Sequence, residues 1–125
     1  MLDQLAKGIN YYGQNLYKPA LLEFDNILDT NPNYTEALYY KGLILQDSGN
    51  FSDALQYYDK VIAIDPTHFN TLLQKAYVLD DQQKYGEAVE YYDKALAIDP
   101  TSSLALFYKG FALDNLNKYE EAITW

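Results

Sequence analysis

The stretch Tyr57-Tyr58-Asp59-Lys60-Val61-Ile62-Ala63-Ile64-Asp65-Pro66 returns almost unchanged 34 residues later, as Tyr91-Tyr92-Asp93-Lys94-Ala95-Leu96-Ala97-Ile98-Asp99-Pro100. Three of the four prolines, Pro32, Pro66 and Pro100, keep the same 34-residue step. Repetition at a fixed period of roughly 20–50 residues is the signature of repeat architectures. The sequence therefore predicts an array of similar structural units.

Further sets of positions keep the same step. The small residues are Gly8, Gly42, Ala76 and Gly110 in one column, and Ala20, Ala54, Ala88 and Ala122 in another. The aromatic residues are Phe24, Tyr58 and Tyr92 in one column, and Tyr17, Phe51, Tyr85 and Tyr119 in another. Small residues suit places where two helices cross closely, and we expect the rings to fill space between neighbouring units. One unit cannot bury its apolar face alone, whereas stacked units can.

Each unit has the pattern of two helices. In residues 35–68, Ala37, Leu38 and Leu45 recur at helical spacing until the turn cluster Ser48-Gly49-Asn50. A second helical run extends from about Ser52 to Ile64 and stops before Pro66, because the residue before a proline avoids the helical region. The predicted fold class is all-α, built from antiparallel helix pairs.

With these columns the chain resembles the tetratricopeptide repeat family. The resemblance implies a right-handed superhelical solenoid in one domain, with units 1–34, 35–68 and 69–102 and a partial unit 103–125. It also implies that the first helix of each unit lines a concave groove. The departures are Gln4, Leu38, Leu72 and Leu106 at the first aromatic position, Lys7, Lys41, Lys75 and Lys109 in place of Leu, and Ala76 in place of Gly.

Composition argues against several function classes. Acidic residues number 18 against 9 basic ones, all Lys, and the formal charge of −9 disfavours nucleic acid and acidic membrane surfaces as partners. No segment has the length or pattern of a membrane span or secretory signal, so we expect a cytoplasmic protein. The chain has no cysteine, no EF-hand spacing and no Gly-rich phosphate loop, and its one histidine, His68, is expected to be a surface loop residue. We therefore predict no enzyme, no catalytic residues, no metal and no cofactor.

A second apolar stripe runs along the first helices, beside the residues that the repeat needs for packing. Its members are Leu5, Ile9, Tyr12, Tyr39, Tyr40, Leu43, Leu73, Tyr77, Phe107, Tyr108 and Phe111. By the resemblance these columns point into the groove. The stripe either packs against the neighbouring unit or forms a partly exposed apolar floor for a ligand. We predict the second, a groove that binds a peptide or an amphipathic segment.

Charged residues on the first helices allow two interpretations each. Asp47, Asp80, Asp81 and Asp114 are either a solvated face or a negative lip that attracts Lys or Arg of a partner. In the column of Lys7, Lys41, Lys75 and Lys109, each aliphatic stem covers the helix contact while the ammonium reaches water or a carboxylate, or the column is a row of cations for an acidic partner. We favour the solvated face and the paired lysines.

Some members of the family grip the acidic tails of chaperones with a clamp of Lys, Asn and Arg. The matching columns hold Leu5, Ile9, Tyr40, Asn70 and Gln74, or, one unit along, Tyr39, Leu43, Gln74, Leu104 and Tyr108. Neither set has a cation. The expected protein or peptide partner is therefore apolar or basic rather than acidic.

The chain stops at Trp125, inside what should be the second helix of the fourth unit, expected from about Lys118. Three explanations remain open: a piece of a longer protein, a homo-oligomer that caps this C-terminal end, or a tolerated exposed stub. The second gives an alternative function, a structural module that assembles with copies of itself.

Overall fold

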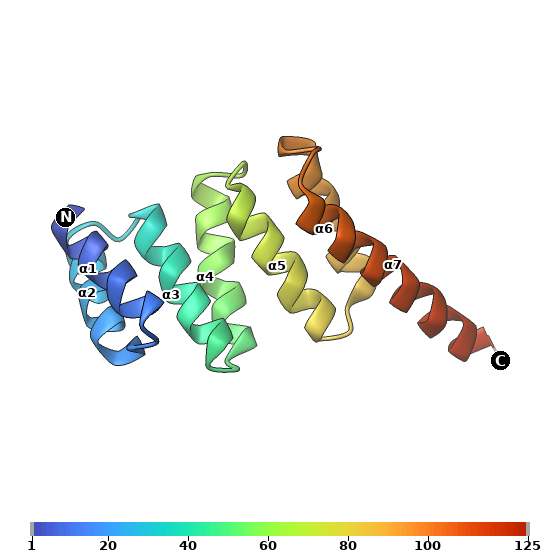
Figure 1. The fold of residues 1–125 in the computed structure, drawn as a ribbon, viewed down its shortest axis with the longest axis horizontal. Helices are drawn as coiled ribbons and strands as arrows, with labels where there is room; N and C mark the ends of the chain where they lie inside the picture. The colour runs from blue at the N-terminus through green and yellow to red at the C-terminus, as the bar shows by residue number, and fades with distance from the viewer. Residues whose placement is uncertain (1, 125) are drawn as a thin grey trace. The chain divides into compact units, whose positions relative to one another are not determined.

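The computed structural model describes residues 2–124, with side chains for residues 3–121, and this part of the chain folds into seven α-helices (Figure 1). They are α1 (Leu2–Gly13), α2 (Tyr17–Thr30), α3 (Thr35–Asp47), α4 (Phe51–Ile64), α5 (Phe69–Asp81), α6 (Tyr85–Ile98) and α7 (Ser103–Thr124). No described helix has the length and apolar character needed to cross a membrane. The side chain of Ala122 and all of Trp125 lie outside the described parts.

The helices form two compact units, Met1–Pro66 and Thr67–Trp125. In the first unit α1 pairs with α2 and α3 with α4, and α3 also packs against α1 and α2. In the second unit α5 pairs with α6, and α7 packs against both.

The turn inside each hairpin has one repeated backbone geometry. The residues Asn15, Gly49 and Gln83 have φ angles of 62°, 81° and 64°, the left-handed region. The next N–H in each turn donates to a carbonyl five residues back, for example Asn50 N to Leu45 O at 2.8 Å. This is the Schellman ending of a helix, in which a left-handed residue satisfies the last carbonyls.

The turn between hairpins ends the second helix at a proline dipeptide. Asn31, Asp65 and Asp99 each follow the last helical residue, and their φ angles of −137°, −135° and −130° are extended. A proline ring disfavours helical backbone in the residue before it. The 34-residue spacing of the prolines therefore fixes where each hairpin stops.

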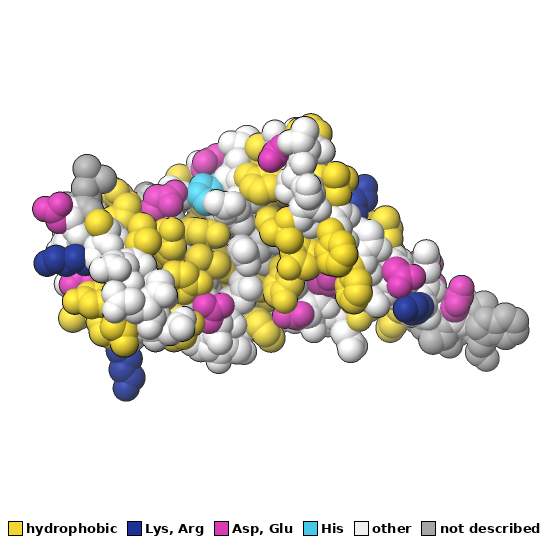
Figure 2. All heavy atoms as spheres, viewed as in Figure 1, with side chains coloured by type: hydrophobic (Ala, Val, Ile, Leu, Met, Phe, Trp, Pro, Cys, Tyr) yellow, Lys and Arg dark blue, Asp and Glu magenta, His cyan; other side chains and the backbone are white. Residues whose placement is uncertain are grey.

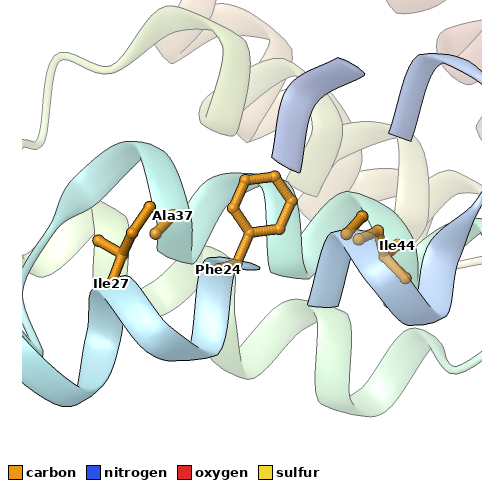
Figure 3. Packing of buried hydrophobic residues seen from close by; sticks show 5 residues of the cluster. Phe24, Ile27, Ala37 and Ile44 are labelled. Atoms are coloured by element: carbon orange, nitrogen blue, oxygen red, sulfur yellow. The ribbon is translucent and has the colours of Figure 1, made fainter. Parts of the chain in front are cut away.

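The core of the first unit lies where the small and aromatic columns meet. Phe24 and Ile27 of α2 are fully buried beside Ala37 and Ile44 of α3 (Figure 3). A Cβ atom built on Gly8 would lie 2.6 Å from the Phe24 ring, so α1 can approach α2 this closely only without a side chain there. Burial of a ring of this size contributes about 1.5–3 kcal/mol.

The same columns behave alike elsewhere, with one exception. A Cβ on Gly42 would lie 2.6 Å from Tyr58. Fully buried positions also include Ala20, Ala54, Ala76, Ala88 and Tyr92. Gly110 differs, because no described atom lies within 4 Å of its Cβ position.

The fourth unit departs from the expectation of a second helix beginning near Lys118. Helix α7 instead continues without a turn from Ser103 to Thr124. Asn117 occupies the column of the left-handed residue Gly49 but is helical. A single helix satisfies all of its internal backbone hydrogen bonds, and breaking it is favourable only where a second helix gains enough packing in return.

Candidate interaction surface

In the first unit most of the predicted floor residues are partly buried. Leu5, Ile9, Tyr12, Tyr40 and Leu43 are half-buried. Tyr39, by contrast, keeps only 8% of its surface exposed. Burial of Tyr39 removes it from any exposed floor.

Ring contacts and hydrogen bonds hold this aromatic cluster in place. Tyr40 stacks on Phe24 with ring centroids 5.5 Å apart and meets Tyr12 edge-on at 5.7 Å. The hydroxyls of Tyr12 and Tyr17 donate to the same carboxylate oxygen of Asp47, at 3.0 and 3.2 Å. Burial, and then the hydrogen bond to Asp47, raise the pKa of Tyr12 well above its usual range. These side chains are therefore engaged within the unit.

In the second unit the equivalent rings are open to solvent. Phe107 and Phe111 of α7 are 66% and 56% exposed, and Tyr77 and Tyr108 are half-buried. Leu73 is the exception, with 7% exposed. Figure 2 shows hydrophobic side chains gathered over α5 and α7, with acidic side chains beside them.

These rings line a hollow, which we call the α5–α7 cavity. It has a volume of about 190 Å³ and is lined by Tyr77, Asp80, Asp81, Phe107, Tyr108 and Phe111. Tyr108 meets Tyr77 at 5.4 Å and Phe107 at 5.7 Å between ring centroids, edge to face in both pairs. The arrangement combines apolar walls with two carboxylates.

The four carboxylates predicted as a possible lip have different surroundings. Asp47 accepts hydrogen bonds from two tyrosines, and Asp114 forms an ion pair with Lys118 at 3.1 Å. Asp80 and Asp81 have no hydrogen-bond or ion-pair partner among the described residues. Desolvation, and then the charge of Asp81, raise the pKa of Asp80. The α5–α7 cavity thus holds the uncompensated pair.

Three of the four lysines in the column, Lys41, Lys75 and Lys109, have partners inside the molecule, and Lys7 is exposed. The ammonium of Lys41 lies 2.7 Å from Asp25, that of Lys109 lies 2.6 Å from Asp93, and Lys75 donates to the Tyr91 hydroxyl at 3.1 Å. Burial lowers the pKa of Lys41, but hydrogen bonds to Asp25 and Tyr57 outweigh it, so the net shift is upward. Lys41 and Lys109 match the favoured interpretation, an ammonium that reaches a nearby carboxylate, whereas Lys75 donates to a tyrosine hydroxyl.

Two tyrosine rings, Tyr57 and Tyr91, contact these lysines and form a lysine–tyrosine network with them. This role of the two rings was not predicted from the sequence. The ammonium groups of Lys41 and Lys60 both lie over the Tyr57 ring, 5.0 and 4.6 Å from its centroid. Those of Lys75 and Lys94 both lie over the Tyr91 ring, each 4.3 Å from its centroid. The signal was present, because Tyr57-Lys60 and Tyr91-Lys94 are one residue pair repeated after 34 residues. A cavity of about 530 Å³ beside this network is lined by Asp25, Leu28, Asp29, Pro32, Leu38, Lys41, Tyr57 and Lys60.

His68 has a structural role beyond that of the expected surface loop residue. It is half-buried and caps α5, with its Nδ1 accepting from the Thr71 amide at 3.3 Å and lying 2.8 Å from the Thr71 hydroxyl. An imidazole nitrogen that accepts these bonds satisfies a free N–H at the helix start. Among the described residues no three His, Cys, Asp or Glu side chains cluster as metal ligands would.

Sequence models of the tetratricopeptide repeat match residues 35–68 and 69–102, and another such model matches residues 91–124. The chain belongs to the tetratricopeptide repeat family. A comparison with curated protein sequences gives no match.

Several solved structures are similar to this one. The first TPR domain of human RPAP3 has a TM-score of 0.88 at 18% identity, covering 96% of this chain and 94% of that one. The first TPR of Spaghetti (RPAP3) bound to the HSP90 peptide SRMEEVD has a TM-score of 0.87 at 18% identity, over 93% and 92%. The crystal structure of MamA has a TM-score of 0.82 at 19% identity, covering 98% of this chain and 67% of that one. These likenesses confirm the predicted fold class, an all-α array of helix pairs of the tetratricopeptide repeat type.

Proposed function

We propose that this chain is a protein-interaction module without enzymatic activity, which binds a peptide or an amphipathic segment of another protein through its first helices. The supporting observation is the exposure of Phe107 and Phe111 beside the half-buried rings of Tyr77 and Tyr108. Burying one such ring against a partner is worth about 1.5–3 kcal/mol. Aromatic side chains of this kind are frequent anchors of interfaces.

The chemistry of the first helices favours an apolar or basic partner. The similar Spaghetti (RPAP3) domain is bound to the peptide SRMEEVD. In this chain the columns that match the family's carboxylate clamp contain no Lys or Arg, and the formal charge is −9. An acidic tail would find no cation there, so we propose a different class of partner.

The absence of catalysis is part of the proposal. His68 is engaged as the cap of α5, with Thr71 as its partner. The lining of the α5–α7 cavity consists of four aromatic rings and two carboxylates and contains no Ser, Cys, His or Lys. Binding is what this arrangement supports.

Selection of binders from a random peptide library tests the proposal. The double variant Phe107→Ala/Phe111→Ala should bind the selected peptides at least about tenfold more weakly than the original chain. Leu22→Ala is the matched control, because Leu22 lies on α2 and is 61% exposed. Equal affinity of the double variant, with its helix content unchanged by circular dichroism, would show that the rings do not form the binding surface.

A second candidate function is self-assembly, and one observation favours it. On α7, Leu106, Gly110 and Leu113 share a helix face, both leucines are exposed, and no described atom lies near the Cβ position of Gly110. In the first unit the same column faces an aromatic ring. Light scattering after size-exclusion chromatography across concentration tests this, and a mass that stays monomeric excludes it. If oligomers form, Leu106→Lys should dissociate them, since a charge would be buried in the contact.

A further inference from the structure

The walls of the α5–α7 cavity suit a cation. An aromatic ring has a negative face, so a cation over it is attracted electrostatically. Phe107 and Phe111 expose more than half of their surface, and Tyr77 and Tyr108 meet edge to face, with 68° between their ring planes. A group that enters this hollow is therefore in contact with several rings at once.

The negative charge at the cavity also favours a cation. Asp80 and Asp81 are adjacent on α5 and have no ion-pair partner among the described residues, and no Lys is part of the lining. The charge of Asp81 is the first cause that raises the pKa of Tyr77, and it also raises that of Asp80. A positive charge placed between these groups would relieve their mutual repulsion.

The first unit has the same columns but a different composition. Two repeats earlier, Asp80 and Asp81 correspond to Tyr12 and Gly13. Tyr12 donates its hydroxyl to Asp47, so ring and carboxylate are already paired there. The combination of open rings and unpaired carboxylates is therefore a property of α5 and α7.

We propose that the α5–α7 cavity binds a cationic side chain of the partner segment, with arginine as the best fit. This inference rests on the proposed function and specifies the chemistry of the partner. Arginine is preferred to lysine because its planar guanidinium stacks on rings and can donate to two carboxylate oxygens together. The net charge of −9 favours the same class of partner.

A pair of small probes tests the proposal without knowledge of the partner. Propylguanidinium and propylurea have nearly the same shape, but only the first is charged. We expect propylguanidinium to shift the ring signals of Tyr77, Phe107 and Phe111 in nuclear magnetic resonance spectra, with a dissociation constant at least about tenfold lower than that of propylurea. Equal binding of the two probes would overturn the proposal, and so would shifts that map to other residues.

Variants separate the carboxylates from general charge effects. Asp80→Asn/Asp81→Asn should weaken propylguanidinium binding at least about tenfold and leave propylurea unchanged. Glu87→Gln/Glu90→Gln is the matched control, because it removes the same charge from exposed positions of α6 and should have no effect beyond a small change at low salt. Equal losses in both double variants would assign the preference to net charge and overturn the site.

The failure of this proposal can be told from the failure of the proposed function. In one test the basic residues of the selected peptides are replaced by citrulline or norleucine. Unchanged binding would support the interaction surface and overturn the cation site. Specific propylguanidinium binding together with an unsuccessful peptide selection would support the cation site and count against the peptide-binding function.

Discussion

Two tyrosines in one repeat column show how a single neighbour changes the energetics of a buried residue. Tyr58 and Tyr92 are both fully buried. The hydroxyl of Tyr58 donates to Gln46 Oε1 at 2.6 Å, whereas the hydroxyl of Tyr92 has no partner among the described residues. Asp80 stands 34 residues after Gln46, and its shorter side chain makes no hydrogen bond to Tyr92.

Removal of the two hydroxyls should therefore change the stability of the protein differently. Tyr58→Phe breaks a hydrogen bond and should lower the free energy of unfolding by about 0.5–1.5 kcal/mol. Tyr92→Phe removes a buried group that has lost its water without gaining a partner, so it should leave stability unchanged or raise it by about 1 kcal/mol. Urea unfolding measures both. Equal losses would mean that the Tyr92 hydroxyl is satisfied in solution.

The glycine column offers a second matched comparison. A Cβ on Gly42 would lie 2.6 Å from the buried ring of Tyr58, while no described atom lies within 4 Å of a Cβ on Gly110. Gly42→Val should lower the free energy of unfolding by about 1–3 kcal/mol through overpacking. Gly110→Val should change it by less than about 0.5 kcal/mol, because only helix propensity is altered. Thermal unfolding checks the pair, and similar losses at both positions would contradict the packing argument.

At the level of elements, the left-handed turn residue decides where each hairpin bends. Gly49 adopts φ 81° without a steric cost, but Gln83 holds φ 64° with a side chain. Gln83→Gly should therefore raise the free energy of unfolding by about 0.5–1 kcal/mol, and Gly49→Gln should lower it by a similar amount. Thermal denaturation followed by circular dichroism measures both changes. A loss on Gln83→Gly would indicate that the flexibility of glycine in the unfolded chain outweighs the relief of strain.

The helix pairs followed from sequence because their signals are local. Turn clusters, proline dipeptides and helical spacing act within one unit, and the 34-residue period repeats them. The single helix α7 could not be predicted in this way. Asn117 stands in the column of a turn residue, but the bend depends on packing between two helices rather than on the asparagine itself.

The sequence predicted which residue types form the candidate site, but not which of them are exposed and unpaired. Tyr77, Phe107, Tyr108 and Phe111 were expected on one surface, and they line the α5–α7 cavity. The burial of Tyr39 depends on how α3 packs against its neighbours, which periodicity alone does not give. The sequence also did not separate the unpaired Asp80 and Asp81 from Asp47, because partners on other helices decide this.

Across the whole molecule, buried tyrosines link stability to alkaline pH. Burial is the first cause that raises the pKa of Tyr12, Tyr39, Tyr58 and Tyr92 above the ordinary value of about 10. A raised pKa means that the folded state favours the protonated form. The stabilisation is complete below the pKa of the unfolded chain and is lost as the pH rises toward the higher folded values.

We therefore expect the free energy of unfolding to fall steeply above about pH 10. Among the 14 tyrosines, the exposed ones should ionise first and the buried ones only as the chain unfolds. Tyrosinate absorbance and circular dichroism, recorded together against pH, check this. Ionisation of all tyrosines in one step near pH 10, with the helices intact, would contradict the buried environment of these rings.

The ion pairs of two lysines in the column also bear on the kinetics of encounter. Lys41 and Lys109 are held against Asp25 and Asp93, so the fields of these pairs largely cancel at a distance, and the chain as a whole keeps a formal charge of −9. A basic partner is then drawn in from a distance by a surplus of negative charge, and its association rate should decline as ionic strength rises. Its dissociation rate depends mainly on the rings it covers. Salt should thus alter how quickly a complex forms far more than how long it lasts.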